Sequence, residues 1–307
     1  MVLILGAGKS GISAKKFLES RGKEVAVYDD KNPVKITEVI ELCVISPGVS
    51  INHPLAVKYS DRLISELELG ISEKHKKVIA ITGTNGKTTV VNMIHNALTK
   101  NKNLFARKSV LCGNVGTPVT AITQQLRNKT AVIEVSSFQL EHAKTFRPKI
   151  AVILNINQDH LERHGTMEEY ARCKAKISEN QKRRDVLILN YDCSLTRSLA
   201  QKESSLSAKK CRQGSHNRVL YFSTSARVRG VYLSGKSIIL NIKGRARKIF
   251  TLDDFGADAP HTIENILATV LVCKLMRVSK RAIIEACKNF PNPHRLEYAG
   301  SFESHTG

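Results

Sequence analysis

The segment VIAITGTNGKTTVVNMIHNAL, residues 78–98, decides the fold prediction. A continuous apolar run leads into a glycine-rich turn, and an amphipathic stretch follows with Val91, Ile94 and Leu98 on one face. This order is typical of a buried strand, a phosphate-binding turn and a helix. The loop is shorter than the standard GxxxxGK[ST] pattern, since Ile81 stands where the first glycine is expected. We therefore predict a shortened phosphate-binding loop.

The turn contains the groups that a triphosphate requires. Its residues are Gly83, Thr84, Asn85, Gly86, Lys87, Thr88 and Thr89. Backbone N–H groups at the start of a helix favour an anion. Lys87 supplies a cation for the β- and γ-phosphates, and the hydroxyl of Thr88 is a ligand for Mg²⁺. We expect Mg·ATP here; the alternative is an ordinary turn with a helix cap.

Predicted strands and helices alternate along most of the chain. The apolar runs are VLILGAG, EVAVYDD, ELCVISPGV, KKVIAITG, TAVIEVSS, KIAVILNI and DVLILN, and helices are expected over 13–20, 87–100, 138–146 and 167–180. This alternation predicts an α/β fold with parallel sheets covered on both faces. A polar, basic segment, 197–218, is expected to be a solvated surface. VLYFS, VYLSG, SIILNI and KIFTL then predict a small antiparallel patch appended to the main sheet.

A second glycine-rich turn lies at the start of the chain. Gly6, Gly8 and Gly11 form GxGxxG after a strand and before a helix, and Asp29 closes the next strand, where such units carry a ribose-binding acid. The pattern fits an NAD(P) site, another nucleotide site or merely a tight turn. A dinucleotide-like unit followed by a triphosphate loop suggests one domain for a nucleotide-linked substrate and one for ATP.

Composition limits the class of protein. Seven cysteines without a CxxC pair predict reduced thiols in a cytoplasmic protein. No apolar run approaches the ~18–20 residues of a membrane span, and the first apolar run lacks a preceding basic region, so it is not a signal peptide. The net charge of +21 would suit nucleic acid, but 5% aromatic residues, no Trp and dispersed basic residues favour a lysine-rich surface.

Four motifs resemble the Mur ligase family, the ATP-dependent amide-forming enzymes of peptidoglycan assembly together with folylpolyglutamate synthase. They are GTNGKTT, CGNVGTP (112–118), IEVSSFQLE (133–141) and NQDHLERHGTMEEYARCKAKI (157–177). The SSFQLE run resembles the D-glutamate-adding branch, since the diaminopimelate- and lysine-adding branches usually have His after the two serines. The resemblance covers nearly all of the chain. It implies a cytoplasmic, monomeric ligase that joins D-glutamate to UDP-N-acetylmuramoyl-L-alanine through an acyl phosphate.

The resemblance assigns catalytic roles to Lys87, Glu134, His160 and Lys174. Thr88 and Glu134 match ligands of the Mg²⁺ on the β- and γ-phosphates, and His160 matches a ligand of a second Mg²⁺ beside the acceptor carboxylate. Lys174 matches a lysine that is carbamylated in the family, which makes it an anionic group of the metal site. Cations and metal ligands are expected at such a site, because negative charge develops near the γ-phosphate during the reaction and must be stabilised.

The resemblance also implies two sets of binding residues. The UDP-linked substrate would contact Lys9, Ser10, Asp29, Ser46, Pro47, Gly48, Asn114, Ser136 and Gln139. ATP would contact the seven residues of the phosphate loop together with Asn265, in a His261–Asn265 adenine motif, and Arg295, which reaches the phosphates. Thr262 departs from the family pattern, because an Asn usually stands there.

The expected domains are a Rossmann-like substrate domain over 1–70, a P-loop-type ATP-binding domain over 71–297 and, over 298–307, the start of a linker to a missing C-terminal D-glutamate domain. The first domain is short, because only residues 30–45 separate Asp29 from Ser46. Because the expected D-glutamate domain is missing, we expect little amide formation by this chain alone. The alternatives are another amide ligase of the family, a non-catalytic nucleotide-binding remnant and a dehydrogenase.

Overall fold

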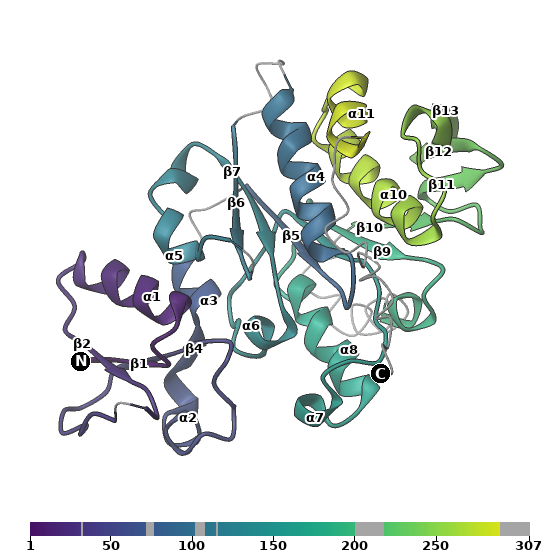
Figure 1. Cartoon of the computed structure of the whole chain (residues 1–307). Coiled ribbons are helices and arrows are strands. Elements are labelled where there is room, and N and C mark those ends of the chain that lie inside the picture. Colours follow the sequence, from purple (N-terminus) through teal and green to yellow (C-terminus); the bar gives the residue numbers. More distant parts are fainter. Residues whose placement is uncertain are drawn as a thin grey trace, which may run out of the picture.

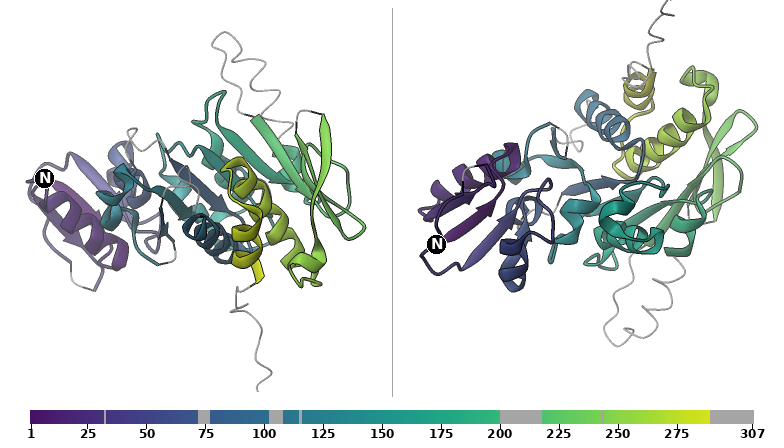
Figure 2. Two further views of the ribbon diagram at one scale, coloured as in Figure 1. Left: turned by 90° about the horizontal axis from the view of Figure 1, so that it is seen from above. Right: turned by 60° about the horizontal axis from the view of Figure 1, so that its bottom comes forward.

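The computed structural model describes residues 1–31, 33–71, 77–101, 108–114, 116–199, 218–242 and 244–288. Two sheets form the protein, a small one at the N-terminus and a large one that follows it in the chain (Figure 1). Figure 2 shows the small sheet beside the large one in two further orientations. Within the described residues, each helix is too short or too polar to cross a bilayer.

The first sheet has four parallel strands in the order β2-β1-β3-β4. They are β1 (Val2–Leu5), β2 (Val25–Tyr28), β3 (Leu42–Ile45) and β4 (Leu63–Ser65). Its helices are α1 (Lys9–Glu19), α2 (Pro54–Lys58) and α3 (Glu66–Gly70), with a 3₁₀ turn η1 (Ser60–Arg62). The described residues 33–41, between β2 and β3, form neither helix nor strand. This connection therefore adds no helix or strand to the first sheet.

Helix α1 begins earlier than the sequence predicted. It starts at Lys9 directly after Gly8, whereas the expected start was residue 13. A Cβ atom on Gly11 would collide with the carbonyl oxygen of Gly6, so the third glycine of the motif lets the helix pack closely on the turn.

The second sheet has nine strands in the order β13-β12-β11-β10-β9-β8-β5-β7-β6. They are β5 (Val78–Thr82), β6 (Ser109–Gly113), β7 (Thr130–Glu134), β8 (Ile150–Ile153), β9 (Val186–Asn190), β10 (Arg218–Ser223), β11 (Gly230–Ser234), β12 (Ser237–Ile242) and β13 (Arg245–Thr251). The first seven of these are parallel, and only the β11–β12 and β12–β13 pairs are antiparallel. The prediction of four antiparallel strands was therefore wrong for β10, which continues the parallel sheet.

Helices cover both faces of the second sheet. On one face lie α4 (Lys87–Lys100), α10 (Pro260–Leu275) and α11 (Lys280–Lys288); on the other lie α5 (Val119–Ile122), α6 (Ser137–Glu141) and α8 (Met167–Ala175) (Figure 1). Alternate residues of β5 point to opposite faces of the sheet. Ile79 packs in the core under α4, and Ala80 packs in the core on the other face. The remaining short elements are α7 (Leu161–His164), η2 (Gln125–Arg127), η3 (Lys176–Ser178) and η5 (Leu252–Asp254).

The predicted helix over 87–100 is confirmed, but two others are shorter than predicted. Helix α6 ends at Glu141, although residues 138–146 were expected to be helical. Helix α8 ends at Ala175 and continues as the 3₁₀ turn η3 to Ser178. Most of the basic segment 197–218 lies outside the described residues.

The two sheets are joined by hydrogen bonds from α3. The Glu68 carboxylate accepts from the backbone N–H groups of Thr145 at 2.7 Å and Phe146 at 3.0 Å. Glu66, which is 1% exposed, accepts from both the N–H and the hydroxyl of Thr120 at 2.7 Å. Burial raises the pKa of Glu66. The hydrogen bonds of Glu66 and Glu68 join the first sheet to the second.

Candidate functional site

The phosphate loop connects β5 to α4 at the carboxyl end of the parallel strands. Gly86 is the N-cap of α4 and has a left-handed backbone, with φ of 81°. A Cβ atom there would collide with the side-chain oxygen of Asn265 on α10. The structure therefore brings the predicted adenine residue Asn265 against the loop. Only glycine combines this backbone with this close approach.

Lys87 folds back over the loop. Its ammonium donates to the carbonyl oxygens of Gly83 at 2.9 Å and Thr84 at 2.7 Å. Burial lowers the pKa of Lys87, while the nearby Glu134 carboxylate acts in the opposite direction. The cation is thus held at the loop, within reach of an anion bound there.

Two further residues hold the loop from the neighbouring strand end. The N–H of Thr84 donates to the carbonyl of Asn155 at 3.0 Å, and the N–H of Asn85 donates to the Asn155 side chain at 2.8 Å. The Thr84 hydroxyl donates to the carbonyl of Asn157 at 3.2 Å. Asn155 and Asn157 were not predicted as site residues. The signal was available, since they follow an apolar run that ends beside the loop's own strand.

Thr88, Glu134 and Asn114 form one hydrogen-bonded group. The Thr88 hydroxyl donates to one Glu134 carboxylate oxygen at 2.8 Å, and the Asn114 amide donates to the other at 3.2 Å. Glu134 closes β7 beside β5, and it is 1% exposed. A hydroxyl and a desolvated carboxylate side by side are oxygen ligands of the kind that Mg²⁺ prefers, so these residues fit the predicted metal.

Lys174 is buried beside the same loop. Its side chain is 1% exposed, its ammonium donates to the Gly83 carbonyl at 3.0 Å, and it lies 4.4 Å from the centre of the Tyr170 ring. Gly83 therefore accepts from both Lys87 and Lys174. Burial, followed by the charge of Lys87, lowers the pKa of Lys174 to about 7. A large fraction of this side chain is thus a neutral amine near neutral pH.

His160 lies apart from the group around Glu134. It is the N-cap of α7 in a left-handed conformation, with φ of 52°, which is uncommon for a residue other than glycine. Its ring is 5.0 Å from that of Phe138, and its Nε2 is 3.4 Å from the Asp159 carboxylate. Within the described part of the chain, no hydrogen bond or ion pair joins His160 to Glu134 or Thr88.

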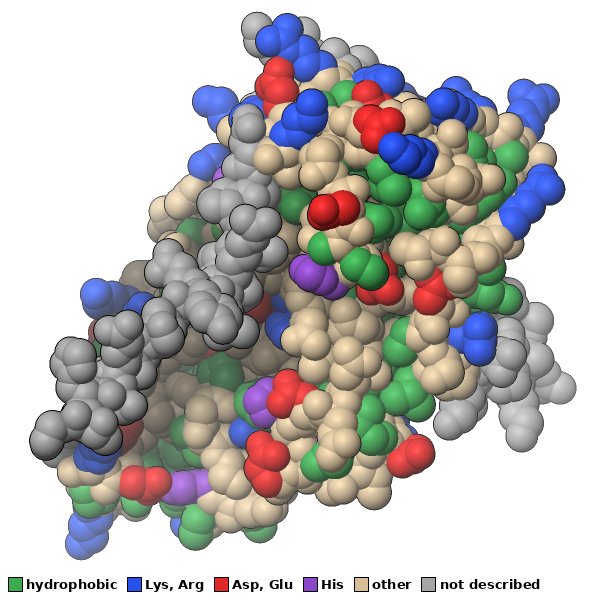
Figure 3. All heavy atoms as spheres, turned by 45° about the vertical axis from the view of Figure 1, so that its right-hand side comes forward, with side chains coloured by type: hydrophobic (Ala, Val, Ile, Leu, Met, Phe, Trp, Pro, Cys, Tyr) green, Lys and Arg blue, Asp and Glu red, His purple; other side chains and the backbone are tan. Residues whose placement is uncertain are grey.

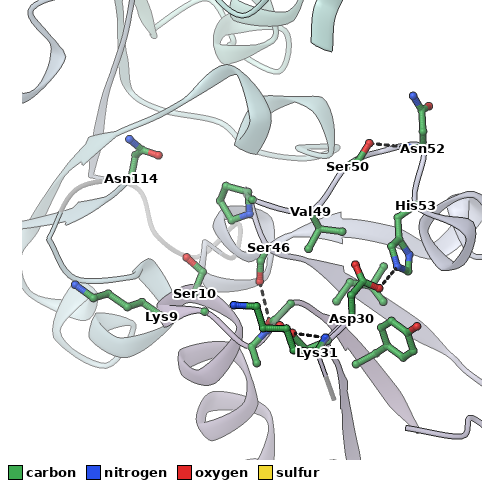
Figure 4. A pocket seen from close by; sticks show the side chains of 18 residues that line it. Lys9, Ser10, Asp30, Lys31, Ser46, Val49, Ser50, Asn52, His53 and Asn114 are labelled. Carbon is green, nitrogen blue, oxygen red and sulfur yellow. Dashed lines mark hydrogen bonds and ion pairs between the residues drawn. The ribbon is translucent and has the colours of Figure 1, made fainter. Parts of the chain in front are cut away.

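The first sheet carries a cavity of about 690 Å³ around its glycine-rich turn. Seven of the nine predicted substrate residues line it: Lys9, Ser10, Asp29, Ser46, Pro47, Gly48 and Asn114. In Figure 4, Lys9 and Ser10 come from the start of α1, Ser46 from the end of β3, and Asn114 from the second sheet. The cavity therefore lies where the two sheets meet.

Asp29 supports the glycine-rich turn. Its carboxylate accepts from the N–H groups of Ala7 at 2.9 Å and Lys31 at 3.1 Å. These two hydrogen bonds lower the pKa of Asp29, so it is an anion near neutral pH. The carboxylate lies at the cavity wall, where a ribose hydroxyl could also donate to it.

Ser136 and Gln139 are not part of this cavity. They form a capping box at the start of α6, in which the Gln139 side-chain oxygen accepts from the Ser136 N–H at 3.0 Å. Gln139 is 1% exposed. In this structure both side chains support the helix that follows Glu134.

Known proteins are similar to this chain in sequence. A family model described as the Mur ligase middle domain matches residues 81–273. UDP-N-acetylmuramoylalanine–D-glutamate ligase of Pelotomaculum thermopropionicum is 33% identical, and the match covers 98% of this chain and 69% of that protein. The enzyme of the same name from Enterococcus faecalis is 35% identical, with 98% and 68% covered. The chain belongs to the Mur ligase family.

Solved structures of Mur-type ligases share the fold. UDP-N-acetylmuramate:L-alanyl-gamma-D-glutamyl-meso-diaminopimelate ligase from Neisseria meningitides superposes with a TM-score of 0.57 at 16% identity, covering 96% of this chain and 99% of that chain. A pseudomurein peptide ligase type C from Methanothermus fervidus gives 0.52 at 18% identity, with 95% and 70% covered. The predicted family and the α/β fold class are therefore confirmed.

The family resemblance did not identify every residue of the cavity. His53, the N-cap of α2, also lines it; its Nδ1 accepts from the Leu55 N–H at 3.2 Å, and its Nε2 lies 3.1 Å from the Asp30 carboxylate. Since Nδ1 is an acceptor, Nε2 carries the proton and donates to Asp30. The His-Pro pair before a short helix was the sequence signal for this cap.

The structure describes the predicted adenine motif and the distribution of basic side chains on one face, but not Arg295. Arg295, with the neighbouring His294, lies outside the described residues. His261, at the start of α10, is exposed, whereas Asn265 is 9% exposed. Figure 3 shows Lys and Arg side chains around the rim of one face and not in a single patch. This distribution on that face is what a lysine-rich surface predicts.

Proposed function

We propose that this Mur ligase family member uses ATP to join D-glutamate to UDP-N-acetylmuramoyl-L-alanine in peptidoglycan precursor synthesis. The relatives that match nearly all of the chain carry the name of that reaction. The observation that carries the proposal is Asn114, which lines the first cavity and donates to Glu134 beside the phosphate loop. One residue thus connects the proposed substrate site to the proposed ATP site.

ATP would lie with its phosphates on the loop and its adenine toward Asn265. Lys87 would then turn from the carbonyls of Gly83 and Thr84 to the β- and γ-phosphates. Thr88 and Glu134 would hold Mg²⁺, which neutralises phosphate charge. The buried position of Glu134 strengthens its attraction for a cation, because water screens it little.

The chemistry would proceed in two displacements. A carboxylate oxygen of the muramoyl-alanine group attacks the γ-phosphorus and ADP leaves, which gives an acyl phosphate. The amine of D-glutamate then attacks the acyl carbon, loses a proton, and inorganic phosphate leaves as the amide forms. We assign catalytic roles in these two displacements to Lys87, Glu134, His160 and Lys174. Positive groups and metal ligands stabilise the negative charge that develops around the γ-phosphate.

We further propose that Lys174 reacts with CO₂. The neutral amine nitrogen would attack the carbon of CO₂, one C=O π bond would open, and the nitrogen would release a proton to water. A pKa of about 7 makes the neutral amine abundant. The carbamate would be an anion beside Lys87, so the two side chains would attract each other, whereas two ammonium groups repel. The modified Lys174 would then be a ligand or water-ordering group of a second Mg²⁺, with His160 as its other ligand.

The domain boundaries and the cellular setting belong to the same proposal. Residues 1–70 would bind the UDP-linked substrate and 71–297 would bind ATP, with 298–307 leading to the D-glutamate-binding part. We propose a reducing, cytoplasmic environment for the protein. The described cysteines, which form no disulfide, are Cys43, Cys112, Cys173, Cys193, Cys273 and Cys287. We propose that the protein acts as a monomer.

Calorimetry tests both binding sites. Mg·ATP should bind the wild type and bind Lys87→Met at least tenfold more weakly, since a phosphate-binding cation is lost. UDP-N-acetylmuramoyl-L-alanine should bind more tightly than NAD, and the reverse order would exclude the ligase assignment. Phosphate release and incorporation of labelled D-glutamate then report on turnover. Binding of both ligands without either product would favour the non-catalytic alternative.

A further inference from the structure

Arg163, on α7, connects the second sheet to the rim of the substrate cavity. Its Nε and Nη2 donate to the two carboxylate oxygens of Glu141 at 3.1 and 2.6 Å. Its Nη1 donates to the backbone carbonyl of Pro47 at 3.2 Å. The Arg163 and Glu141 side chains are 16% and 12% exposed, so water competes little for these contacts.

The guanidinium is suited to this bridge. Two of its N–H groups make a parallel pair with a carboxylate, and the third nitrogen remains free to donate in another direction. A lysine ammonium at the same place carries the charge but cannot present this planar fork. The contact with Pro47 therefore depends on the shape of Arg163 as well as on its charge.

The same side chain packs against Phe138 of α6, whose ring also lies beside His160. The Arg163 guanidinium carbon is 4.1 Å from the centre of the Phe138 ring, and that ring is 5.0 Å from the ring of His160. Phe138 is on α6 and His160 begins α7. Arg163 thus contacts the cavity turn at Pro47 and the ring of Phe138, and that ring in turn contacts His160, the predicted metal ligand.

The residues around Glu141 resemble a metal site in composition, but their side chains hydrogen-bond to other residues of the protein. Ligand atoms of Glu141, His164 and Cys173 lie within 4.8 Å of one another. Glu141 already accepts from Arg163, His164 Nε2 lies 3.0 Å from the Ser137 hydroxyl, and the Cys173 thiol donates to the Ser137 carbonyl. The Glu141 carboxylate is thus held by Arg163, while Ser137 holds the side chains of His164 and Cys173.

We propose that Arg163 is a positioning residue that holds the Ser46-Pro47-Gly48 turn of the substrate cavity against the α6–α7 segment. This inference rests on the proposed function, because it assigns the cavity to the UDP-linked substrate. The turn lines the cavity, and the N–H of Val49 donates to the Ser46 carbonyl at 3.0 Å to close it. Loss of Arg163 frees the turn and weakens substrate binding.

The chain offers a matched control. Lys144 also reaches from the second sheet to the first, since its ammonium donates to the backbone carbonyl of Asp61 at 3.0 Å. Lys144 is exposed, and Asp61 is not among the residues that line the cavity. Lys144→Ala therefore removes a cation and a hydrogen bond between the sheets without touching the cavity turn.

The first measurement is affinity by calorimetry on the full chain. Arg163→Ala should weaken binding of UDP-N-acetylmuramoyl-L-alanine by about tenfold to hundredfold, the range for lost hydrogen bonds to a charged donor. Arg163→Lys should recover only part of the loss, and Lys144→Ala should bind like the wild type. Mg·ATP affinity should change less than twofold in all three. Equal substrate affinity in Arg163→Ala and the wild type would overturn the proposal.

The second measurement needs no substrate, so it separates this proposal from the proposed function. Amide hydrogen exchange at Val49 should be faster in Arg163→Ala than in the wild type, while exchange in β5 stays the same. Unchanged exchange at Val49 would contradict the role of Arg163 even if UDP ligands bind. If the wild type binds no UDP-linked substrate, the proposed function fails. The hydrogen-exchange rate at Val49 still shows whether Arg163 holds the turn. Glu141→Gln, which keeps the side-chain shape, replaces Arg163→Ala if that variant does not fold.

Discussion

Replacing Lys174 by Met should remove a pH dependence from the stability of this protein. The side chain is 1% exposed, and burial, together with Lys87, lowers its pKa from 10.5 to about 7. Between these values the unfolded chain binds a proton that the folded chain does not bind. The wild type therefore loses stability as the pH falls from about 10 to 7, and the loss is complete once the pH is below the folded pKa. Met has a similar length and no charge.

The size of the effect follows from the two pKa values. Proton linkage predicts that Lys174 destabilises the fold by about 2 kcal/mol more at pH 7 than at pH 9. The stability advantage of Lys174→Met over the wild type should therefore grow by that amount between the two conditions. The charge of Lys87 contributes to the effect, because the two ammonium groups share the carbonyl of Gly83.

Urea unfolding at pH 7 and 9, in buffer free of CO₂, measures this difference. Lys182→Met is the control, because it makes the same substitution at an exposed position. An advantage of Lys174→Met that is the same at both pH values would refute the burial of a depressed-pKa lysine. Labelled bicarbonate, followed by carbon-13 NMR, then tests whether the wild-type amine forms a carbamate that the variant lacks.

Two other substitutions test the ATP site. Gly86→Ala should cost about 1–2 kcal/mol of stability, because Gly86 has a left-handed backbone. It should also weaken Mg·ATP binding, because the new methyl group collides with Asn265. Gly235→Ala is the control, with φ of 53° and no atom within 4 Å, and should show only the stability loss when both variants are compared by unfolding and calorimetry. Glu134→Gln should reduce the Mg²⁺ dependence of ATP affinity while Thr88 keeps a hydrogen-bond acceptor. Unchanged Mg²⁺ titrations in that variant would remove Glu134 from the metal site.

The sequence predicted the strand–loop–helix unit around the phosphate loop because its signals are local. Apolar periodicity and the glycine positions lie within 78–98, and the structure forms β5 and α4 there. The direction of β10 could not be predicted in this way. Alternation of side chains is the same in parallel and antiparallel strands, so direction depends on how the connection returns the chain to the sheet.

Motifs located the candidate site better than they assigned individual roles. Most of the predicted substrate residues line one cavity. The Gln139 side chain instead forms a capping box with Ser136. The Ser-x-x-Gln spacing of 136–139 was the sequence signal for that cap. The contact between Arg163 and Pro47 joins residues 116 positions apart. Only the packed fold brings such residues together, so no local pattern could predict it.

The distance between the two proposed sites is set at the end of β6. A Cβ atom on Gly113, whose φ is 115°, would collide with the backbone carbonyl of Glu134, so only glycine lets β6 approach β7 at this point. The next residue, Asn114, then donates to Glu134 twice, through its N–H at 2.8 Å and its side chain at 3.2 Å, while it also lines the first cavity. A substrate carboxylate that reaches the Asn114 end of that cavity is therefore one side chain away from the carboxylate that would hold Mg²⁺ on ATP. Gly113 and Asn114 would thereby bring the ligands that we propose for the two glycine-rich turns to the same edge of the second sheet.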